Sequence, residues 1–154
     1  AQASKATWLP VEKEYKSKHV AYVIVEPNCF YCKRLYIQLM PFIKEKSVAV
    51  RWIVTAVLQP SSEEKAAVLL QAKDPLKALH SVYFQHLELH VDAVLPATKD
   101  VLTKNNKLLT DYQLGVPAII YKSVNQSYKV LLGVPSYESM QLAILDMQGE
   151  FDDN

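Results

Sequence analysis

Two cysteines, Cys29 and Cys32, are the residues of this chain best suited to covalent chemistry. They are the only cysteines in the sequence, and two residues separate them. A thiolate attacks a disulfide sulfur to give a mixed disulfide, and a second thiol one helical turn away can then attack that mixed disulfide. The segment Cys29-Phe30-Tyr31-Cys32 therefore predicts a redox pair that forms and breaks its own disulfide and needs no other cofactor.

The elements around the pair favour this interpretation. Residues 19–25 are β-branched and aromatic without polar alternation, which is typical of a central strand covered on both faces. Asn28 is a suitable N-cap for a helix that opens at Cys29. A thiol at a helix N-terminus has a lowered pKa, because unpaired amides and the helix dipole stabilise its thiolate. We therefore expect Cys29 to be the nucleophile and Cys32 the more buried, resolving thiol.

The same spacing of cysteines also forms half of a zinc site, which is the main alternative. There is no second cysteine pair, and His80, His86 and His90 lie in a predicted helical block rather than in a zinc knuckle. His86 and His90 could share one helical face and hold a metal, but histidines on an amphipathic helix are more often surface residues. We expect no metal site.

Further helices and strands follow from local patterns. Pro41 lies inside the first helical pattern and should kink it. Ser61 and Glu64 form a capping-box pattern, and Asp74-Pro75 is a second helix start. The expected strands are 19–25, 48–58, 116–121 and 128–132, and the expected helices are 29–44, 61–72, 74–89, part of 94–113, and 136–147. This order predicts an α/β protein with a mixed sheet and helices on both faces.

Charge and hydropathy exclude two classes of partner. Seventeen basic and sixteen acidic side chains leave a formal charge of +1, so no strong field attracts nucleic acid. The apolar runs 20–25 and 116–121 are strand-sized, far short of the roughly 18 residues of a membrane span. Ala1-Gln2-Ala3-Ser4 lacks the basic and apolar regions of a signal peptide, so we expect a mature, processed chain.

The sequence resembles a known family, the periplasmic disulfide isomerases of the DsbC and DsbG type, and most closely its DsbG branch. The resemblance covers residues 19–147. It is carried by Glu26-Pro27-Asn28-Cys29-Phe30-Tyr31-Cys32-Lys33, by Pro41, and by Ala72-Lys73-Asp74-Pro75-Leu76-Lys77 in the helical block.

This resemblance implies a thioredoxin-like fold with a helical insertion between the second strand and a cis-proline strand. It also implies that Cys29 is an exposed nucleophile and that Pro117 is the cis-proline facing the pair. A cis X-Pro bond there would present the backbone of Val116 for strand-like pairing with an extended substrate. The alternative is a trans-proline that merely starts an edge strand.

Three further residues complete the predicted site. Phe30 and Tyr31, between the cysteines, are expected to contact substrate together with Val116 and Pro117. Glu26 is either an acidic residue that tunes the thiols, as the resemblance implies, or an ordinary solvated loop carboxylate.

Two departures from the family bear on the direction of catalysis. The isomerases usually carry threonine where this chain has Val116, which is more similar to the oxidase DsbA. They also carry an N-terminal dimerisation domain, for which the roughly 18 residues before the first strand are too few. No histidine of the DsbA kind stands between the cysteines. We expect a disulfide isomerase or reductase; a DsbA-like dithiol oxidase and a chaperone-like module for unfolded clients are the alternatives.

The predicted organisation is a lead-in over residues 1–18, a catalytic domain over 19–148 with its insertion at about 60–113, and an acidic tail over 149–154. The resemblance implies a periplasmic location. It also implies two kinds of partner: disulfide-containing or misfolded secreted proteins, and a membrane electron donor or oxidant of the DsbD or DsbB kind.

Overall fold

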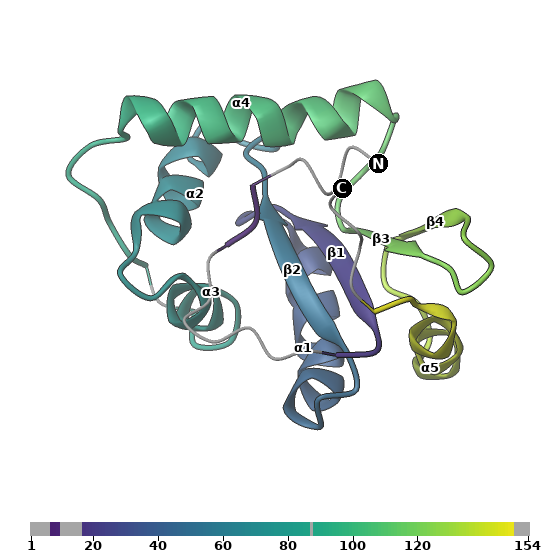
Figure 1. Cartoon of the computed structure of the whole chain (residues 1–154). Coiled ribbons are helices and arrows are strands. Elements are labelled where there is room, and N and C mark those ends of the chain that lie inside the picture. Colours follow the sequence, from purple (N-terminus) through teal and green to yellow (C-terminus); the bar gives the residue numbers. More distant parts are fainter. Residues whose placement is uncertain (1–6, 10–16, 87, 150–154) are drawn as a thin grey trace.

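The computed structural model describes residues 7–9, 17–86 and 88–149 (Figure 1). Most of the predicted lead-in and nearly all of the acidic tail lie outside these residues. A four-stranded sheet in the order β2-β1-β3-β4 occupies the centre. Its strands are β1 (Val20–Val25), β2 (Ala49–Val54), β3 (Ala118–Lys122) and β4 (Tyr128–Leu132).

Strand pairing follows the lengths of the connections. β1 and β2 are parallel, because a helix of fifteen residues, α1 (Phe30–Lys44), carries the chain back between them. β3 pairs antiparallel with β1 on one side and with β4 on the other, and β3 and β4 are joined by a short turn. The predicted mixed sheet is therefore confirmed.

Helices cover both faces of the sheet, as the sequence predicts. The alternate β1 residues Ala21, Val23 and Val25 belong to the core that contains the buried sides of α1 and α5 (Tyr137–Asp146). Tyr22 and its even-numbered neighbours in β1 belong to a second cluster, which contains Leu108 of α4 (Pro96–Asp111). None of the helices in the described part of the chain is long and apolar enough to cross a membrane.

The insertion between β2 and β3 consists of α2 (Ser62–Gln71), α3 (Pro75–Tyr83) and α4 (Figure 1). Two boundaries predicted around it were wrong. β2 ends at Val54 rather than 58. The Asn106 side chain forms hydrogen bonds with both the N–H and the carbonyl of Ala56, so these groups do not pair with a neighbouring strand. α3 ends at Tyr83 rather than 89, and His86 then adopts a left-handed φ of 55° that no α-helix continues.

Helix caps are partly as predicted. Asp74 caps α3 by accepting from the Lys77 amide at 3.2 Å. The Ser61 capping box is wrong, since Ser61 has helical backbone angles and its side chain makes no cap hydrogen bond. Pro41 lies inside α1, which continues to Lys44.

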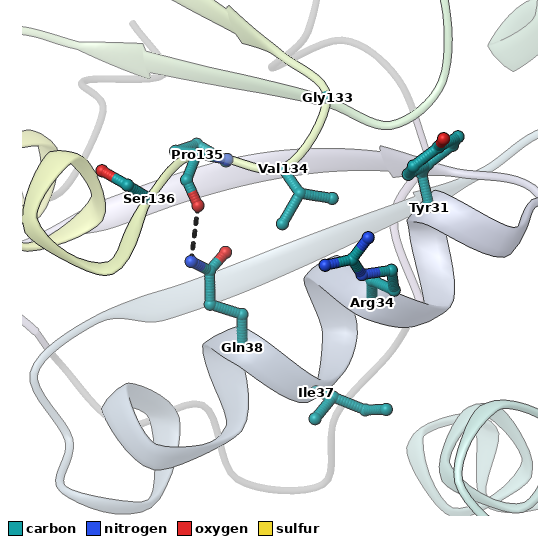
Figure 2. Close-up of a pocket in the computed structure, with 8 residues that line it drawn as sticks. All are labelled: Tyr31, Arg34, Ile37, Gln38, Gly133, Val134, Pro135 and Ser136. Atoms are coloured by element: carbon teal, nitrogen blue, oxygen red, sulfur yellow. Dashed lines mark hydrogen bonds between the residues drawn. The ribbon is translucent and has the colours of Figure 1, made fainter.

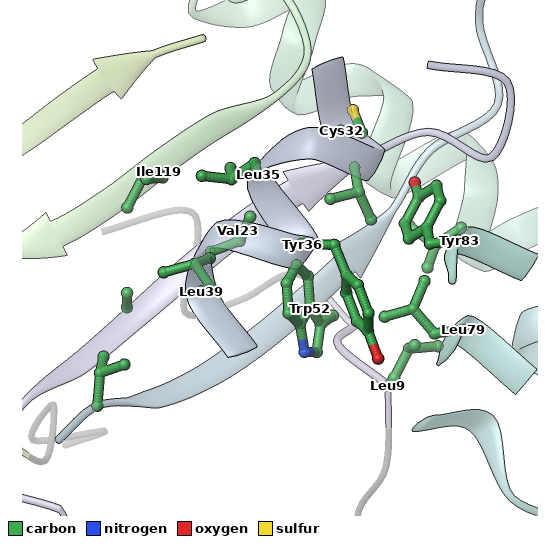
Figure 3. Packing of buried hydrophobic residues seen from close by; sticks show 14 of the residues in the cluster. Leu9, Val23, Cys32, Leu35, Tyr36, Leu39, Trp52, Leu79, Tyr83 and Ile119 are labelled. Carbon is green, nitrogen blue, oxygen red and sulfur yellow. The ribbon is translucent and has the colours of Figure 1, made fainter. Parts of the chain in front are cut away.

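The base of α1 is anchored by tightly packed side chains. Leu35 and Leu39 are at most 2% exposed and lie against the sheet beside Val23 and Ile119 (Figure 3). Tyr36 packs against the Trp52 ring, with ring centroids 5.4 Å apart. A rigid α1 in turn fixes the position of its N-terminus, where the cysteines lie.

Candidate active site

Cys29 is itself the N-cap residue of α1. Its backbone is extended, with φ −90° and ψ 114°, and its sulfur accepts a hydrogen bond from the Cys32 amide at 3.1 Å. The predicted N-cap, Asn28, was wrong by one residue, because its side chain is engaged elsewhere. The side-chain Nδ2 of Asn28 donates to Ser62 Oγ at 2.9 Å, and its Oδ1 accepts from Lys65 Nζ at 2.7 Å.

Both cysteines are free thiols, and both are buried. Cys32 has no exposed surface, and Cys29 is 7% exposed, so Cys29 is the accessible sulfur of the two but is less exposed than expected. The reason is its orientation, since the sulfur turns inward to cap the helix. There the Cys29 thiol also donates to the Val116 carbonyl oxygen at 3.7 Å.

The two thiols have opposite pKa shifts. The pKa of Cys29 falls from 9.0 to about 7, chiefly because the Cys32 thiol donates a hydrogen bond to its sulfur, with help from the Cys32 and Tyr31 amides; burial opposes the fall. The pKa of Cys32 is raised, first by burial and then by the neighbouring Cys29. At neutral pH the negative charge therefore resides on Cys29.

We expect the alkylation of the reduced protein to follow this order. The iodoacetamide rate at Cys29 should reach half its maximum near pH 7, because the thiolate is the reacting species and its fraction rises with pH through the pKa. Cys32 should stay unmodified over the same range. The measurement is mass spectrometry of peptides after timed labelling. A midpoint near pH 9 at Cys29, or equal labelling of both cysteines, would contradict the assignment.

Pro117 faces the cysteine pair through the residue before it. The Val116–Pro117 peptide bond is cis, which agrees with the expectation and excludes the trans alternative. Pro117 is buried, and its carbonyl accepts from the Gly133 amide at 3.0 Å, so the segment is held between β3 and β4. The Val116 carbonyl is left pointing at Cys29.

Glu26 is a fully buried carboxylate, so the alternative of a solvated loop residue was wrong. Its Oε1 accepts from the Asn28 amide at 2.8 Å, and its Oε2 accepts from the Leu58 amide at 2.9 Å and from Ser62 Oγ at 3.1 Å. Its charge is one of the smaller causes that raise the pKa of both thiols. Glu26 thus joins the active-site loop to α2.

Tyr83 is a site neighbour that the sequence did not single out. Its hydroxyl donates to the Glu26 carbonyl at 2.8 Å, and its ring is 2% exposed. Burial raises its pKa well above 10, and the charges of Cys32, Cys29 and Glu26 add to this. In the sequence it is only an apolar position of the helical block, and no local signal connects it to the cysteines.

The histidines are not arranged as a metal site. Because α3 ends at Tyr83, His86 and His90 do not share a helical face; His86 contacts Lys33 at 2.9 Å, and His90 lies 3.6 Å from Glu64. Within residues 7–9, 17–86 and 88–149, no three His, Cys, Asp or Glu side chains come together as a metal site would require.

The aromatic residues between the cysteines border a groove. Phe30 and Tyr31 are 64% and 56% exposed and contact each other edge to face, with centroids 5.6 Å apart. Tyr31 forms one end of a groove of about 760 Å³ between α1 and the loop of residues 133–136 that joins β4 to α5 (Figure 2). We call this the α1 groove.

Comparison with curated proteins gives matches to thiol:disulfide interchange proteins. No family model matches the chain. It is 29% identical to the thiol:disulfide interchange protein DsbG of Escherichia coli over 92% of this chain, and 41% identical to DsbG of Pseudomonas aeruginosa over 40% of it. The chain spans 62% of the E. coli protein and 24% of the P. aeruginosa protein.

Solved structures share the fold at low sequence identity. A disulfide interchange protein from Neisseria gonorrhoeae has a TM-score of 0.65 at 19% identity and covers 89% of this chain and 94% of its own. ScsC of Proteus mirabilis in a compact conformation also has a TM-score of 0.65, at 18% identity, over 84% of this chain and 68% of its own. The predicted thioredoxin-like fold with a helical insertion is confirmed.

The chain thus has a thioredoxin-like fold and two free cysteines in a CxxC arrangement, and the curated proteins that its sequence matches are thiol:disulfide interchange proteins. The sequence matches support the predicted DsbG-like thiol:disulfide interchange family.

Proposed function

We propose that this protein is a thiol-disulfide oxidoreductase in which Cys29 is the nucleophile and Cys32 the resolving thiol. One observation carries the proposal: a thiol with a pKa of about 7 caps a helix, directly beside a fully buried thiol whose pKa is raised. This difference suits Cys29 to attack the client disulfide and Cys32 to attack only after the mixed disulfide has formed.

The reaction balances without any external cofactor. The Cys29 thiolate attacks one sulfur of a client disulfide, a Cys29-to-client bond forms, and the other client sulfur leaves as a thiolate. The charge on Cys29 is then gone, so one of the causes that raise the Cys32 pKa is removed. Cys32 next loses its proton and attacks the Cys29 sulfur. The client leaves as a dithiol, reduced by two electrons, and the cysteine pair is oxidised by two electrons to the Cys29–Cys32 disulfide.

Substrate contacts are proposed at the rim of the site. The backbone of Val116 beside cis-Pro117 pairs with an extended client segment, as the Val116 carbonyl already faces the reacting sulfur. Phe30 and Tyr31 supply exposed aromatic surface on the other side. The charge of Glu26 raises the pKa of both thiols to a small extent.

The pKa of Cys29 favours isomerase or reductase action over strong oxidase action. A pKa near 7 is similar to that of thioredoxin and far above the value of about 3.5 in DsbA, whose disulfide is strongly oxidising because its thiolate is so stable. Val116, where the isomerases resembled carry threonine, supports DsbA-like oxidation as the second candidate.

The wider setting is proposed from the family. Clients are disulfide-containing or misfolded secreted proteins, the compartment is the periplasm, and a membrane protein of the DsbD or DsbB kind resets the pair. The catalytic unit is residues 19–148, preceded by a lead-in and followed by an acidic tail.

One model client tests the direction of catalysis. A multi-disulfide protein is offered scrambled, reduced or correctly oxidised, and regain of its native activity or loss of its disulfides is followed. We expect recovery from the scrambled form or reduction with a thiol donor to be fastest. Fast oxidation of the reduced form alone would favour the oxidase. Aggregation prevented equally by a Cys29→Ser, Cys32→Ser double variant, with no exchange by the wild type, would favour the chaperone-like module.

A further inference from the structure

We infer that the α1 groove is a subsite for an acidic side chain of the client, with Arg34 as the residue that selects it. This inference rests on the proposed function and names the class of client it acts on: disulfides with an aspartate or glutamate close to the reacting cysteine. Three features of the α1 groove support it: its position beside the redox pair, the positive charge in it and one buried side-chain atom without a hydrogen-bond partner.

The position of the groove links it to the redox pair. Tyr31, one residue before Cys32, lies at one end, and the groove continues along α1 past Arg34 to Gln38 (Figure 2). Its opposite wall is the loop that follows β4, and this loop also holds the cis-proline segment, since the Gly133 amide donates to the Pro117 carbonyl. A client segment bound at Val116 therefore has a direct route into the groove.

The charge in the groove has one sign. α1 carries Lys33, Arg34 and Lys44 and no acidic residue. Lys33 contacts His86 on another side of the helix. The Arg34 guanidinium extends into the groove toward Val134 (Figure 2), and within the described residues it has no hydrogen-bond or ion-pair partner. A guanidinium presents a planar set of donors that matches a carboxylate in two parallel hydrogen bonds.

Gln38 supplies the second polar group. Its amide nitrogen donates to the Pro135 carbonyl, which fixes the side chain across the groove. Its Oε1 is buried and has no hydrogen-bond partner, the one such side-chain atom in the described part of the chain. A buried acceptor without a donor is unfavourable and is usually satisfied by a partner or water. The exposed donors of Arg34 fit one carboxylate of a peptide segment, and Gln38 Oε1 could accept a nearby backbone N–H once its side chain turns toward the groove.

The distance from Cys29 to Arg34 determines where the acidic residue of the client should lie. Arg34 lies five positions after Cys29, which is about 7.5 Å along a helix. An extended peptide advances about 3.3 Å per residue. The carboxylate is therefore expected roughly two or three residues from the client cysteine bonded to Cys29.

Matched peptide disulfides test this inference. Three versions of one short peptide carry Glu, Gln or Lys two or three residues from the cysteine, and kcat/KM for their reduction is measured with wild type, Arg34→Gln and Arg34→Glu. We expect the wild type to prefer the Glu peptide over Gln by about five-fold, the order of one partly exposed charge pair. Arg34→Gln should lose this preference, and Arg34→Glu should prefer the Lys peptide.

A matched control removes a cation from the same helix outside the groove. Lys44→Gln has the same charge change and should keep the five-fold preference, which separates the subsite from the general field of α1. Equal rates with all peptides in the wild type, or an unchanged preference in Arg34→Gln, would overturn the inference and leave the proposed function standing. No reduction of any peptide by the wild type would overturn both.

Discussion

Cys32→Ser is expected to accumulate mixed disulfides with its clients, whereas Cys29→Ser is expected to lose disulfide exchange altogether. In the first variant Cys29 keeps its place as the N-cap of α1 and still attacks, but no second thiol releases the adduct. In the second, the remaining thiol is fully buried with a raised pKa. We expect its rate to fall on the order of 10³-fold or more, as with the loss of other enzymatic nucleophiles.

Both outcomes are read from the same samples. Trapped complexes run as slow bands on non-reducing gels and disappear on reduction, and mass spectrometry identifies the sulfur that holds the client. The double serine variant is the control for association without covalent chemistry. Adducts joined through Cys32, or exchange retained in Cys29→Ser, would reverse the roles assigned to the two cysteines.

Glu26→Ala is expected to be the most destabilising single change in the active-site loop. It leaves three donors without their acceptor: the amides of Asn28 and Leu58 and the Ser62 hydroxyl. At about 1–3 kcal/mol for each buried donor left unpaired, with water able to reach part of the site, we expect a loss of about 3–5 kcal/mol in the free energy of unfolding. The Cys29 pKa should also fall, because a charge that raises it is removed.

Urea unfolding measures the first effect, and the pH dependence of Cys29 alkylation measures the second. Glu63→Ala is the matched control, since that carboxylate is about half exposed and lies 3.9 Å from Lys99 in a weak surface pair. Its effect should stay within about 0.5 kcal/mol. Equal losses in the two variants would show that the buried hydrogen bonds of Glu26 do not hold the loop.

The sequence was most informative where local pattern and chemistry coincide. The buried strand β1, the cysteine pair at a helix start and the β3–β4 hairpin depend on residues close together in the chain, and each could be predicted. Resemblance to the family supplied cis-Pro117, which no local pattern requires.

What failed depends on contacts between distant segments. The choice between Asn28 and Cys29 as N-cap was decided by Ser62 and Lys65, more than thirty positions away. The role of Glu26 stayed open because the groups that donate to its carboxylate, the Leu58 amide and the Ser62 hydroxyl, lie more than thirty positions away in the sequence. Likewise, the sequence of α1 predicts only an amphipathic helix. The groove beside Arg34 and Gln38 exists because the loop after β4 packs opposite them.

The redox equilibrium of Cys29 and Cys32 decides whether the protein acts as a thiol-disulfide oxidoreductase. The purified protein is equilibrated with glutathione buffers of graded potential, and free thiols are trapped and counted by mass. We predict that Cys29 and Cys32 lose and regain their thiols together, as one two-electron couple nearer to thioredoxin at about −270 mV than to DsbA at about −120 mV. Failure to form an intramolecular disulfide at any potential would show that the two cysteines are not a redox pair.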